Sequence, residues 1–476
     1  MSTSWSYSRC AKCPNNHRQV LPNGPTHARI MMIGDSPGKT EDKRGEPLCG
    51  LAGQEFNYTY LDLAGLRRSE IFCTNTVQCR VERNESDVRP TAGIIESCAS
   101  NHLIEEIHTV NPKIIILSGA VANSLVPGIN LEMEHGFPRP GELFGWTGTI
   151  VPMYSPAVGM HETRYMIQLL EDWTNFGRWL SGQWKPPVPP SIPIRYTLIP
   201  PGGFWEAVGA EPEYYSALPI DTESDEGRMW SVQFSTQPGV GFMFLTSDRS
   251  NVEDFGAWLA FTYDNRVIMH NAPWDLDELF QIGISDLIAE DTMQDSYHIG
   301  NKPQGLKALT YRLFGHRMVS YRETVIPYSK SKLEGWLAEA LGYASTELRS
   351  VVPHPVGKSC PTCGKNHRKD VSVSKPHESE STLRRIMEKM GDPESEYDPW
   401  EMPKYSKGVE KTRLIGKPWM KELEAAVGRM PRCSIVHVPI EQAVQYGCSD
   451  ADWTGRVGEW FAAERKRIVR AEWRVA

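Results

Sequence analysis

Residues 217–227 are ALPIDTESDEG, a short apolar run that ends in two acids one residue apart. Asp221 and Glu223 are expected to point to the same side of an extended strand, because successive side chains alternate between its two faces. Two carboxylates side by side repel each other, so either water solvates them at an ordinary strand end or both hold a cation. Other motifs in this half of the chain favour the cation.

Two further polar pairs follow apolar stretches in the same half of the chain. The stretch RVIMHNAPWDLDEL places Asn271 and Asp275 four residues apart, so both lie on one face of a predicted helix. The stretch AVQYGCSDADW places Tyr446 and Asp450 four residues apart on a second predicted helix. We expect four carboxylates to meet over one end of a sheet: Asp221, Glu223, Asp275 and Asp450.

Such a cluster of acids is unfavourable without cations, and hard oxygen ligands suit Mg²⁺ or Mn²⁺. Two metal ions held close together can generate hydroxide from water and stabilise the attacking and leaving oxygens of a phosphodiester. The hydroxyl of Tyr446 can orient the attacking water. The pattern therefore predicts a centre for phosphodiester hydrolysis with two metal ions.

The motif order D-x-E, N-x-x-x-D, Y-x-x-x-D resembles that of DEDD-type 3′–5′ exonucleases of the DEDDy subgroup. Residues 291–315, DTMQDSYHIGNKPQGLKALTYRLFG, resemble the segment between the second and third motifs in the proofreading domain of family A DNA polymerases. The resemblance covers roughly residues 215–325 and 433–465. It implies a ribonuclease H-like fold in which the four acids bind the metals, Tyr446 positions the water and Asn271 supports the site.

The first part of the chain alternates buried strands with helical stretches. Between Ala28 and Trp184, the runs ARIMMIG, IFCTNTVQC, KIIILSG and TIVPMYSP each lead into a loop or helix, which predicts a parallel α/β sheet. The stretch KPPVPPSIPIRYTLIPPGG that follows can neither continue a helix nor pair in a central strand. We therefore expect a first domain over residues 1–184, a linker over 185–205 and a second domain over 206–476.

Four cysteines of the first domain come from separated segments. Cys10 and Cys13 form a C-x-x-C motif, Cys79 follows a predicted strand, and Cys98 lies on the next predicted helix. Four thiolates could bind zinc or a [4Fe–4S] cluster, and the spacing alone does not choose between them. The chain has ten cysteines and no signal-peptide pattern at its start, which indicates a reducing cytoplasm (the host's, for a phage protein) and favours metal ligation over disulfides.

The first domain resembles family 4 uracil-DNA glycosylases over about residues 8–183. The matching pieces are GDSPGKTED, GEPLCGLAG, TNTVQCR, the helix cysteine and IILSGAVANSL. The resemblance implies an α/β/α fold, a [4Fe–4S] cluster on the four cysteines and a pocket for a flipped-out uracil. It also implies that Asp35 and Glu41 lie near the glycosidic bond and that Asn75 reads the base.

Two pocket positions differ from that family. Leu48 stands where the family usually has a phenylalanine that stacks on uracil, and Ser155 stands where it has a histidine that stabilises the departing uracil anion. A serine is neutral and shorter than a histidine, so it supplies less electrostatic stabilisation. We therefore expect the first domain to bind DNA but to excise uracil weakly.

The second domain contains a polar segment, about residues 321–432, that we interpret as an insertion. Within it Cys360, Cys363 and His367 form half of a zinc site, which needs a fourth ligand to be tetrahedral. The alternative is a loop with two thiols and no metal. Candidates for the fourth ligand are His354, His377 and Cys433.

Composition is that of an ordinary globular protein, with 476 residues, 40% hydrophobic and 23% charged. The net charge of −8 argues against a surface coated with basic residues, and no apolar run approaches the length of a membrane span. The main hypothesis is a proofreading exonuclease that acts on frayed or single-stranded 3′ ends beside a separate, phage-type polymerase chain. The alternatives are a DNA repair enzyme with active glycosylase and exonuclease sites, and a non-catalytic DNA-binding scaffold of a replisome.

Overall fold

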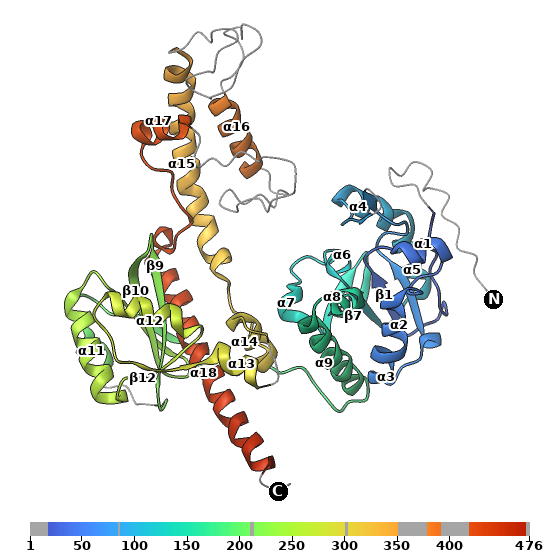
Figure 1. The fold of residues 1–476 in the computed structure, drawn as a ribbon, viewed down its shortest axis with the longest axis horizontal. Coiled ribbons are helices and arrows are strands. Elements are labelled where there is room, and N and C mark those ends of the chain that lie inside the picture. Colours follow the sequence, from blue (N-terminus) through green and yellow to red (C-terminus); the bar gives the residue numbers. More distant parts are fainter. Residues whose placement is uncertain are drawn as a thin grey trace. The chain divides into compact units, whose positions relative to one another are not determined.

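The computed structural model describes residues 18–83, 86–209, 214–299, 303–350, 378–391 and 418–472. They form two compact units, whose elements are labelled in Figure 1. The first unit comprises Met1–Pro193, Asp291–Met318 and Arg456–Ala476, and the second comprises Ile194–Glu290 and Val319–Gly455. Two late segments thus belong with the first unit, whereas a division at the linker alone would assign them to the second.

The first unit is built on a five-stranded sheet in the order β2–β1–β5–β7–β6. Four strands run parallel: β1 (Ile30–Gly34), β2 (Ile71–Asn75), β5 (Ile114–Ser118) and β7 (Trp146–Met153). β6 (Arg139–Leu143) pairs antiparallel with β7 at one edge. All four apolar runs identified in the sequence form these strands, so the predicted parallel α/β sheet is confirmed.

Helices cover both faces of this sheet, because the residues of β1 alternate between two apolar cores. Ile30 and Met32 pack in one core with Trp173 of α9 (Thr163–Leu180). Met31 and Ile33 pack in the other core with Ile107 of α5 (Ile104–Val110). A sheet buried on both sides explains why its strands are continuous apolar runs.

The second unit contains a six-stranded mixed sheet in the order β13–β12–β9–β10–β11–β8. β9, β10 and β11 form an antiparallel meander, and β12 and β8 join its two sides in parallel. The strands are β8 (Arg195–Leu198), β9 (Leu218–Asp225), β10 (Arg228–Gln237), β11 (Val240–Leu245), β12 (Arg266–Met269) and β13 (Ile288–Asp291). The extended strand expected at Asp221 and Glu223 is therefore present as β9.

The linker is shorter than the proline-rich stretch of the sequence suggests. Arg195–Leu198 forms edge strand β8 beside β11, and the N–H of Arg195 donates to the carbonyl of Gly239 (2.7 Å). These four residues contain no proline, so their N–H groups can pair. Further on, Phe204 in α10 (Phe204–Val208) is fully buried in the core of the second unit. The expected linker over residues 185–205 thus ends in elements of the second unit.

The polar insertion contributes three helices with a small core of their own, labelled in Figure 1. They are α15 (Tyr321–Ser350), α16 (Glu378–Gly391) and α17 (Pro418–Val427). Leu337, Leu383 and Leu423, one from each helix, are fully buried together. The predicted zinc ligands Cys360, Cys363 and His367, and the candidate ligands His354 and His377, lie outside the described residues.

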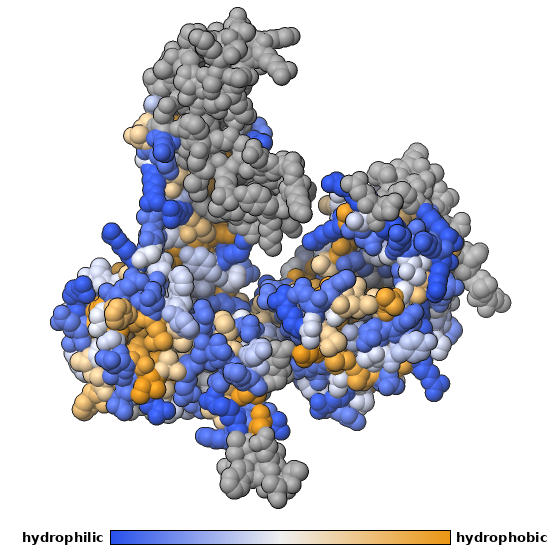
Figure 2. Space-filling model, viewed as in Figure 1, coloured by the Kyte–Doolittle hydropathy of each residue, from blue (hydrophilic) through white to orange (hydrophobic). Residues whose placement is uncertain are grey.

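The described surface is mixed in character. Figure 2 shows mostly hydrophilic side chains on the face in view, interrupted by smaller apolar areas. The longest helix, α18 (Ile440–Glu472), also carries many charged residues. None of the described helices combines the length and the apolar character needed to cross a membrane.

Candidate functional site

Polar residues collect at the carboxyl edge of the parallel sheet in the first unit. Asp35 directly follows β1, Asn75 ends β2, and Ser155 follows β7. The chain proceeds from β1 to β2 on one side and returns to β5 on the other, so the strand order reverses between β1 and β5. Ligands of open α/β sheets bind in the crevice at such a reversal, which makes this edge the candidate site.

The Asp35 carboxylate is anchored by backbone donors of α6 (Ala120–Asn123). Its Oδ1 accepts hydrogen bonds from the N–H groups of Val121 (2.9 Å) and Ala122 (2.8 Å). Burial raises the pKa of Asp35 to about 6, although these N–H groups act to lower it. A Cβ on Gly119 would lie 2.5 Å from this carboxylate, so only glycine leaves room for it. The site thus holds an acid that titrates close to neutral pH, as catalytic carboxyls do.

Asn75 is held at the same edge. Gly34 pairs with it across β1 and β2, and a Cβ on Gly34 would lie 2.6 Å from its Oδ1. The hydroxyl of Thr76 donates to the carbonyl of Gly34 (2.9 Å), which fixes the strand end beside it. Asn75 as a whole residue is 8% exposed, so it is largely shielded from bulk water.

Glu41 lies in α1 (Lys39–Arg44), and Leu48 lies in the loop that follows this helix. Oε1 of Glu41 accepts from the N–H of Gly50 (2.7 Å). Leu48 has a φ of 55°, a left-handed conformation that a branched side chain rarely adopts. A Cβ on Gly53 would lie 1.9 Å from the Leu48 carbonyl oxygen, so the loop requires glycine there. Glu41 therefore orders the loop that presents Leu48.

Ser155 begins α8 (Pro156–His161). Its Oγ accepts from the N–H of Ala157 (3.3 Å), and Pro156 occupies the first turn, both common at a helix start. A hydroxyl that accepts one hydrogen bond still carries its own O–H donor. His161 lies in the last turn of the same helix and is exposed.

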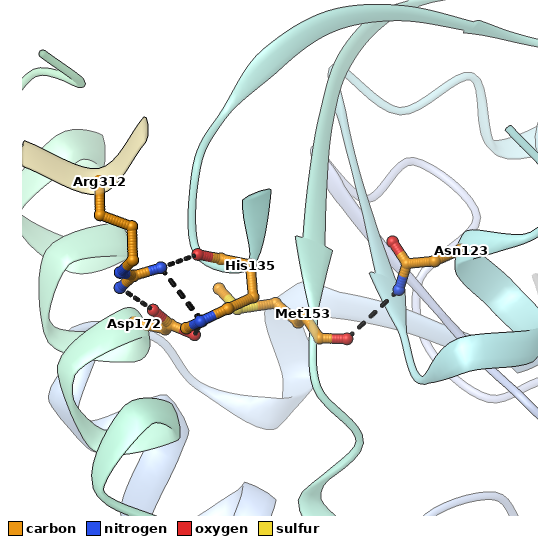
Figure 3. Close-up of polar contacts among 5 residues, drawn as sticks. All are labelled: Asn123, His135, Met153, Asp172 and Arg312. Carbon is orange, nitrogen blue, oxygen red and sulfur yellow. Dashed lines mark hydrogen bonds and ion pairs between the residues drawn. The ribbon is translucent and has the colours of Figure 1, made fainter. Parts of the chain in front are cut away.

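The backbone leading to Ser155 is fixed from two sides. The carbonyl of Pro152 accepts from the N–H of Gly136 (2.8 Å). The carbonyl of Met153 accepts from the N–H of Gly119 (2.9 Å) and from Nδ2 of Asn123 (3.3 Å), the second of which Figure 3 shows. The turn after β7 is therefore positioned by its neighbours before any ligand binds.

The comparisons with known proteins concern this unit. Residues 21–174 match the uracil DNA glycosylase superfamily. The chain is 38% identical over 172 residues to the type-4 uracil-DNA glycosylase of Sulfurisphaera tokodaii, covering 34% of this chain and 76% of that protein. The chain belongs to the uracil-DNA glycosylase superfamily. Residues 21–174 are called the glycosylase domain below.

Two further relatives agree with this assignment. The type-4 uracil-DNA glycosylase of Thermotoga maritima is 32% identical over 156 residues, which cover 31% of this chain and 77% of that protein. The corresponding enzyme of Saccharolobus solfataricus is 30% identical over 184 residues, covering 37% and 83%. The resemblance of the first half is thereby confirmed. The family match ends at residue 174, so the exonuclease resemblance stays a prediction.

The described part of the predicted cluster site consists of Cys79 and Cys98, both buried. The N–H of Gln78 donates to Sγ of Cys98 (3.3 Å), which brings the two cysteines to one region. Gln19 and Cys79 form an isolated antiparallel β-bridge. The segment shortly after the C-x-x-C motif therefore runs beside Cys79. Cys10 and Cys13 themselves lie outside the described residues. Two buried thiols close to the segment that follows the C-x-x-C motif fit a thiolate-bound cluster. The full set of four ligands stays a prediction.

A buried polar network adjoins these cysteines, and no spacing pattern in the sequence indicates it. Nε2 of Gln78 donates to Oγ1 of Thr74 (3.0 Å) and to Oε1 of Glu106 (3.0 Å). It also lies 3.2 Å from Nδ1 of His102. Buried polar groups of this kind need such mutual hydrogen bonds to be tolerated. The network fixes Gln78 and, through its N–H, the surroundings of Cys98.

A second group that the sequence analysis missed is a buried cluster of His135, Asp172 and Arg312, drawn in Figure 3. Nδ1 of His135 lies 2.6 Å from Oδ2 of Asp172, and Arg312 donates to Oδ1 of Asp172 (3.1 Å). Burial lowers the pKa of His135, although Asp172 acts to raise it. Burial opposes ionisation of Asp172, but His135 and Arg312 outweigh it and lower its pKa. Arg312 follows His135 by 177 residues, too far for a local motif to reveal.

In the second unit, Asp221 and Glu223 lie two residues apart on β9, opposite Gln233 and Ser231 of β10. α18 packs on this face, because a Cβ on its Gly447 would lie 2.7 Å from Gln233. The same helix carries Tyr446 and Asp450. The predicted acids of β9 and the predicted residues of α18 therefore share one side of the sheet.

The surroundings of Tyr446 are acidic. Burial raises the pKa of its phenol most, and Asp450 raises it further by its charge and by a hydrogen bond. Glu223 and Asp221 act in the same direction. Tyr446 therefore keeps its proton at all ordinary pH values and can act as a hydrogen-bond donor among carboxylates.

Asp275 is held differently. It lies in the first turn of α12 (Ala272–Gln281), where its Oδ1 accepts from the hydroxyl of Thr222 (2.7 Å). Strand alternation points Thr222 away from the face that carries Asp221 and Glu223. Asn271 precedes the helix in a left-handed conformation, with φ of 71°. Within the described ranges, no three His, Cys, Asp or Glu side chains are arranged to hold a metal ion, so the two-metal centre stays a prediction.

Proposed function

We propose that the glycosylase domain excises uracil from DNA in repair, and that the same chain carries a 3′–5′ exonuclease. The observation that carries the first part is the set of Asp35, Asn75 and Ser155 at the carboxyl edge of a parallel sheet, in a chain related to type-4 uracil-DNA glycosylases. This function corresponds to the repair alternative of the sequence analysis rather than to the proofreading hypothesis.

The reaction assigns a role to each of these residues. The uracil leaves the base stack and enters the pocket, where Asn75 hydrogen-bonds to its pairing edge. The glycosidic bond breaks with its electron pair on the base, and water adds to the sugar carbon. The ionised carboxylate of Asp35 stabilises positive charge on the sugar and accepts the proton of that water.

Ser155 serves the departing base. Its Oγ already accepts from the N–H of Ala157, so its O–H is the group that can donate to the developing uracil anion. A neutral donor supplies less stabilisation than an imidazole, and Leu48 gives an apolar contact without aromatic stacking. We therefore expect an active enzyme that is slower than one with histidine and phenylalanine at these positions.

The [4Fe–4S] cluster of the domain would be held by Cys10, Cys13, Cys79 and Cys98. When bound, such a cluster supplies redox and electrostatic properties that depend on the hydrogen bonds to its sulfurs. The residues of the chain itself contribute one such bond, from the N–H of Gln78 to Cys98. A zinc ion on Cys360, Cys363 and His367 of the insertion is proposed on sequence spacing alone.

The exonuclease proposal is supported by the acidic surroundings of Tyr446, since Asp450, Glu223 and Asp221 all raise its pKa. With Asp275, these acids would bind two Mg²⁺ or Mn²⁺ ions at a DNA 3′ end. Tyr446 would then donate to the attacking water. Uracil removal followed by trimming of the strand needs no polymerase partner, so a separate polymerase chain is not part of this proposal.

The test is a uracil-containing duplex whose 3′ ends are blocked against degradation, incubated with anaerobically purified protein. We expect alkali-labile abasic sites with the native chain and with Asp221→Ala, and at least about a hundredfold slower formation with Asp35→Asn. Absence of abasic sites with the native chain would refute the glycosylase. An unblocked, 3′-labelled single strand tests the exonuclease separately, with and without Mg²⁺.

A further inference from the structure

Arg312 belongs to a segment that is distant in sequence from the glycosylase domain but part of the same compact unit. It lies on α14 (Leu306–Phe314), within Asp291–Met318. Its side chain is 7% exposed, and its guanidinium lies 5.1 Å from the ring centre of Phe137. A cation buried to this degree is tolerated only when its donors are satisfied, so its partners indicate what it does.

Those partners are the backbone and the side chains of one turn and one helix. Nη1 of Arg312 donates to the carbonyl of His135 (2.7 Å), while Nη2 donates to Asp172 (3.1 Å), as Figure 3 shows. A Cβ on Gly136 would lie 2.3 Å from Asp172, so the next residue also leaves room for this cluster. One guanidinium thereby joins the turn at His135 to α9.

The turn at His135 also contacts the end of β7, which leads into Ser155. The N–H of Gly136 donates to the carbonyl of Pro152 (2.8 Å). The imidazole of His135 lies against the ring of Tyr154, with 4.6 Å between ring centres. Ser155 is the next residue, so Pro152 and Tyr154, two of the three residues that precede it, contact this turn.

We propose that Arg312 is a positioning residue of the glycosylase pocket: it fixes His135 and thereby the Pro152–Tyr154 backbone that presents Ser155. The inference rests on the proposed uracil excision for its kinetic consequence, but the positioning itself is independent of it. The segment Asp291–Met318 lies outside the family match at residues 21–174. Arg312 would therefore be a contribution of this chain's second half to a pocket in its first half.

Arginine is required because the two acceptors lie in different directions. Its planar fork donates to the His135 carbonyl and to Asp172 at once. The ammonium of a lysine keeps the charge but is a compact donor on a flexible stem, so it cannot reproduce both contacts with the same geometry. Arg312→Lys should therefore preserve folding better than Arg312→Ala while restoring only part of the function.

The experiment uses the full chain in an Asp221→Ala background, which removes strand trimming. Arg312→Ala and Arg312→Lys are compared with Arg317→Ala, whose arginine is on the same segment but exposed and 3.4 Å from the carbonyl of Gly128. Single-turnover excision of uracil gives a rate constant and an amplitude, which report the pocket and the folded fraction separately. Hydrogen exchange of the peptide covering residues 152–157 reports the turn directly.

We expect Arg312→Ala to lower the rate constant by about tenfold to a hundredfold, the loss typical of a misplaced catalytic group, and to speed exchange in residues 152–157. Arg312→Lys should be intermediate, and Arg317→Ala should match the parent protein. A change of amplitude or melting temperature with an unchanged rate constant and unchanged exchange would overturn the proposal, because it would make Arg312 merely stabilising.

Two outcomes separate this inference from the proposed function. If the parent protein forms no abasic sites, uracil excision is refuted, and the exchange of residues 152–157 in the Arg312 variants alone decides the positioning role. If Arg312→Ala does not fold, Arg312→Lys carries the test. Parent-like exchange and rate in that variant would overturn the requirement for a guanidinium.

Discussion

The two sheets of the molecule hold their acids in different ways. Asp35 of the parallel sheet lies beyond its strand, where two backbone N–H groups of α6 donate to it. Asp221 and Glu223 of the mixed sheet lie within β9, whose backbone groups already pair with β10. Backbone donors therefore hold Asp35, whereas the two strand acids lie on one face of β9, where their like charges repel and favour a bound cation. The comparison favours metal ions in the second site and none in the first.

The largest effect is expected when the two strand acids of the second site are removed. Replacing both strand acids, Asp221→Ala with Glu223→Ala, should lower Mg²⁺-dependent release of 3′-terminal nucleotides by orders of magnitude, because the predicted ligands are lost. The apo protein should be as stable as the parent or more so, since like charges no longer repel. Asp35→Asn is the control and should trim normally. Full activity in the double variant would remove the exonuclease assignment.

The matching change in the first site is Asp35→Asn. Excision should fall by about a hundredfold to ten thousandfold, because the variant lacks a proton acceptor. In the parent, the excision rate should rise with pH through about 6, where Asp35 ionises. The profile of the variant should lack this step, and a parent-like step would mean that another group titrates.

The same carboxyl predicts a pH dependence of stability. Its pKa in the folded state is raised from 3.8 to about 6, so the folded protein binds the proton more tightly than the unfolded chain. The resulting stabilisation is fully present below pH 3.8 and is lost as the pH rises through about 6. At pH 7 to 8, Asp35→Asn should melt at the same temperature as the parent or higher. A markedly lower melting temperature would show that the charge itself stabilises the fold.

A smaller effect is expected from the cysteines of the first unit that are predicted to hold the iron–sulfur cluster. The second unit is not predicted to hold such a cluster. Anaerobic protein should contain about four irons per chain and absorb broadly in the visible range. Cys79→Ser or Cys98→Ser should remove the colour and lower the melting temperature of the glycosylase domain. Cys73→Ser is the control, because that buried thiol lies in β2. Stoichiometric zinc without iron in the parent would contradict the assignment.

The smallest effect is expected from substitutions at two positions of the glycosylase pocket. Ser155→His together with Leu48→Phe should raise the excision rate by about tenfold, because an imidazole stabilises the departing anion better and a ring can stack on the base. Ser155→Ala should lower the rate and should also weaken the start of α8, at a cost of about 1 kcal/mol. An unchanged rate in the double variant would mean that these two positions do not limit catalysis.

Sequence reasoning succeeded where a pattern is local. β1, β2, β5 and β7 were predictable because strands buried on both faces are continuous apolar runs. It failed at β8, whose four residues are surrounded by prolines, and in the insertion, where polar composition concealed three helices that bury Leu337, Leu383 and Leu423. Local spacing did find Tyr446 and Asp450 on one helix.

The missed part of the candidate site has a different cause. His135, Asp172 and Arg312 meet only through the tertiary fold, so no spacing rule connects them. Asp275 illustrates the reverse case, because its motif was visible but its hydrogen bond to Thr222 was not. Patterns of spacing therefore identify candidate residues, while the partners that orient them come from the folded chain.

The wide separation of Arg312 from its partners has a consequence during synthesis. Arg312 follows Asp172 by 140 residues, which a ribosome adds in roughly 7 to 28 seconds at common elongation rates. For that time the nascent glycosylase domain must keep His135 and Asp172 together without the guanidinium. The first half of the chain thus emerges early but matures late. If the ribosome stalls after Asp172 and before Arg312, the sheet can already be formed. The turn at His135 then still lacks its hydrogen bond from Arg312.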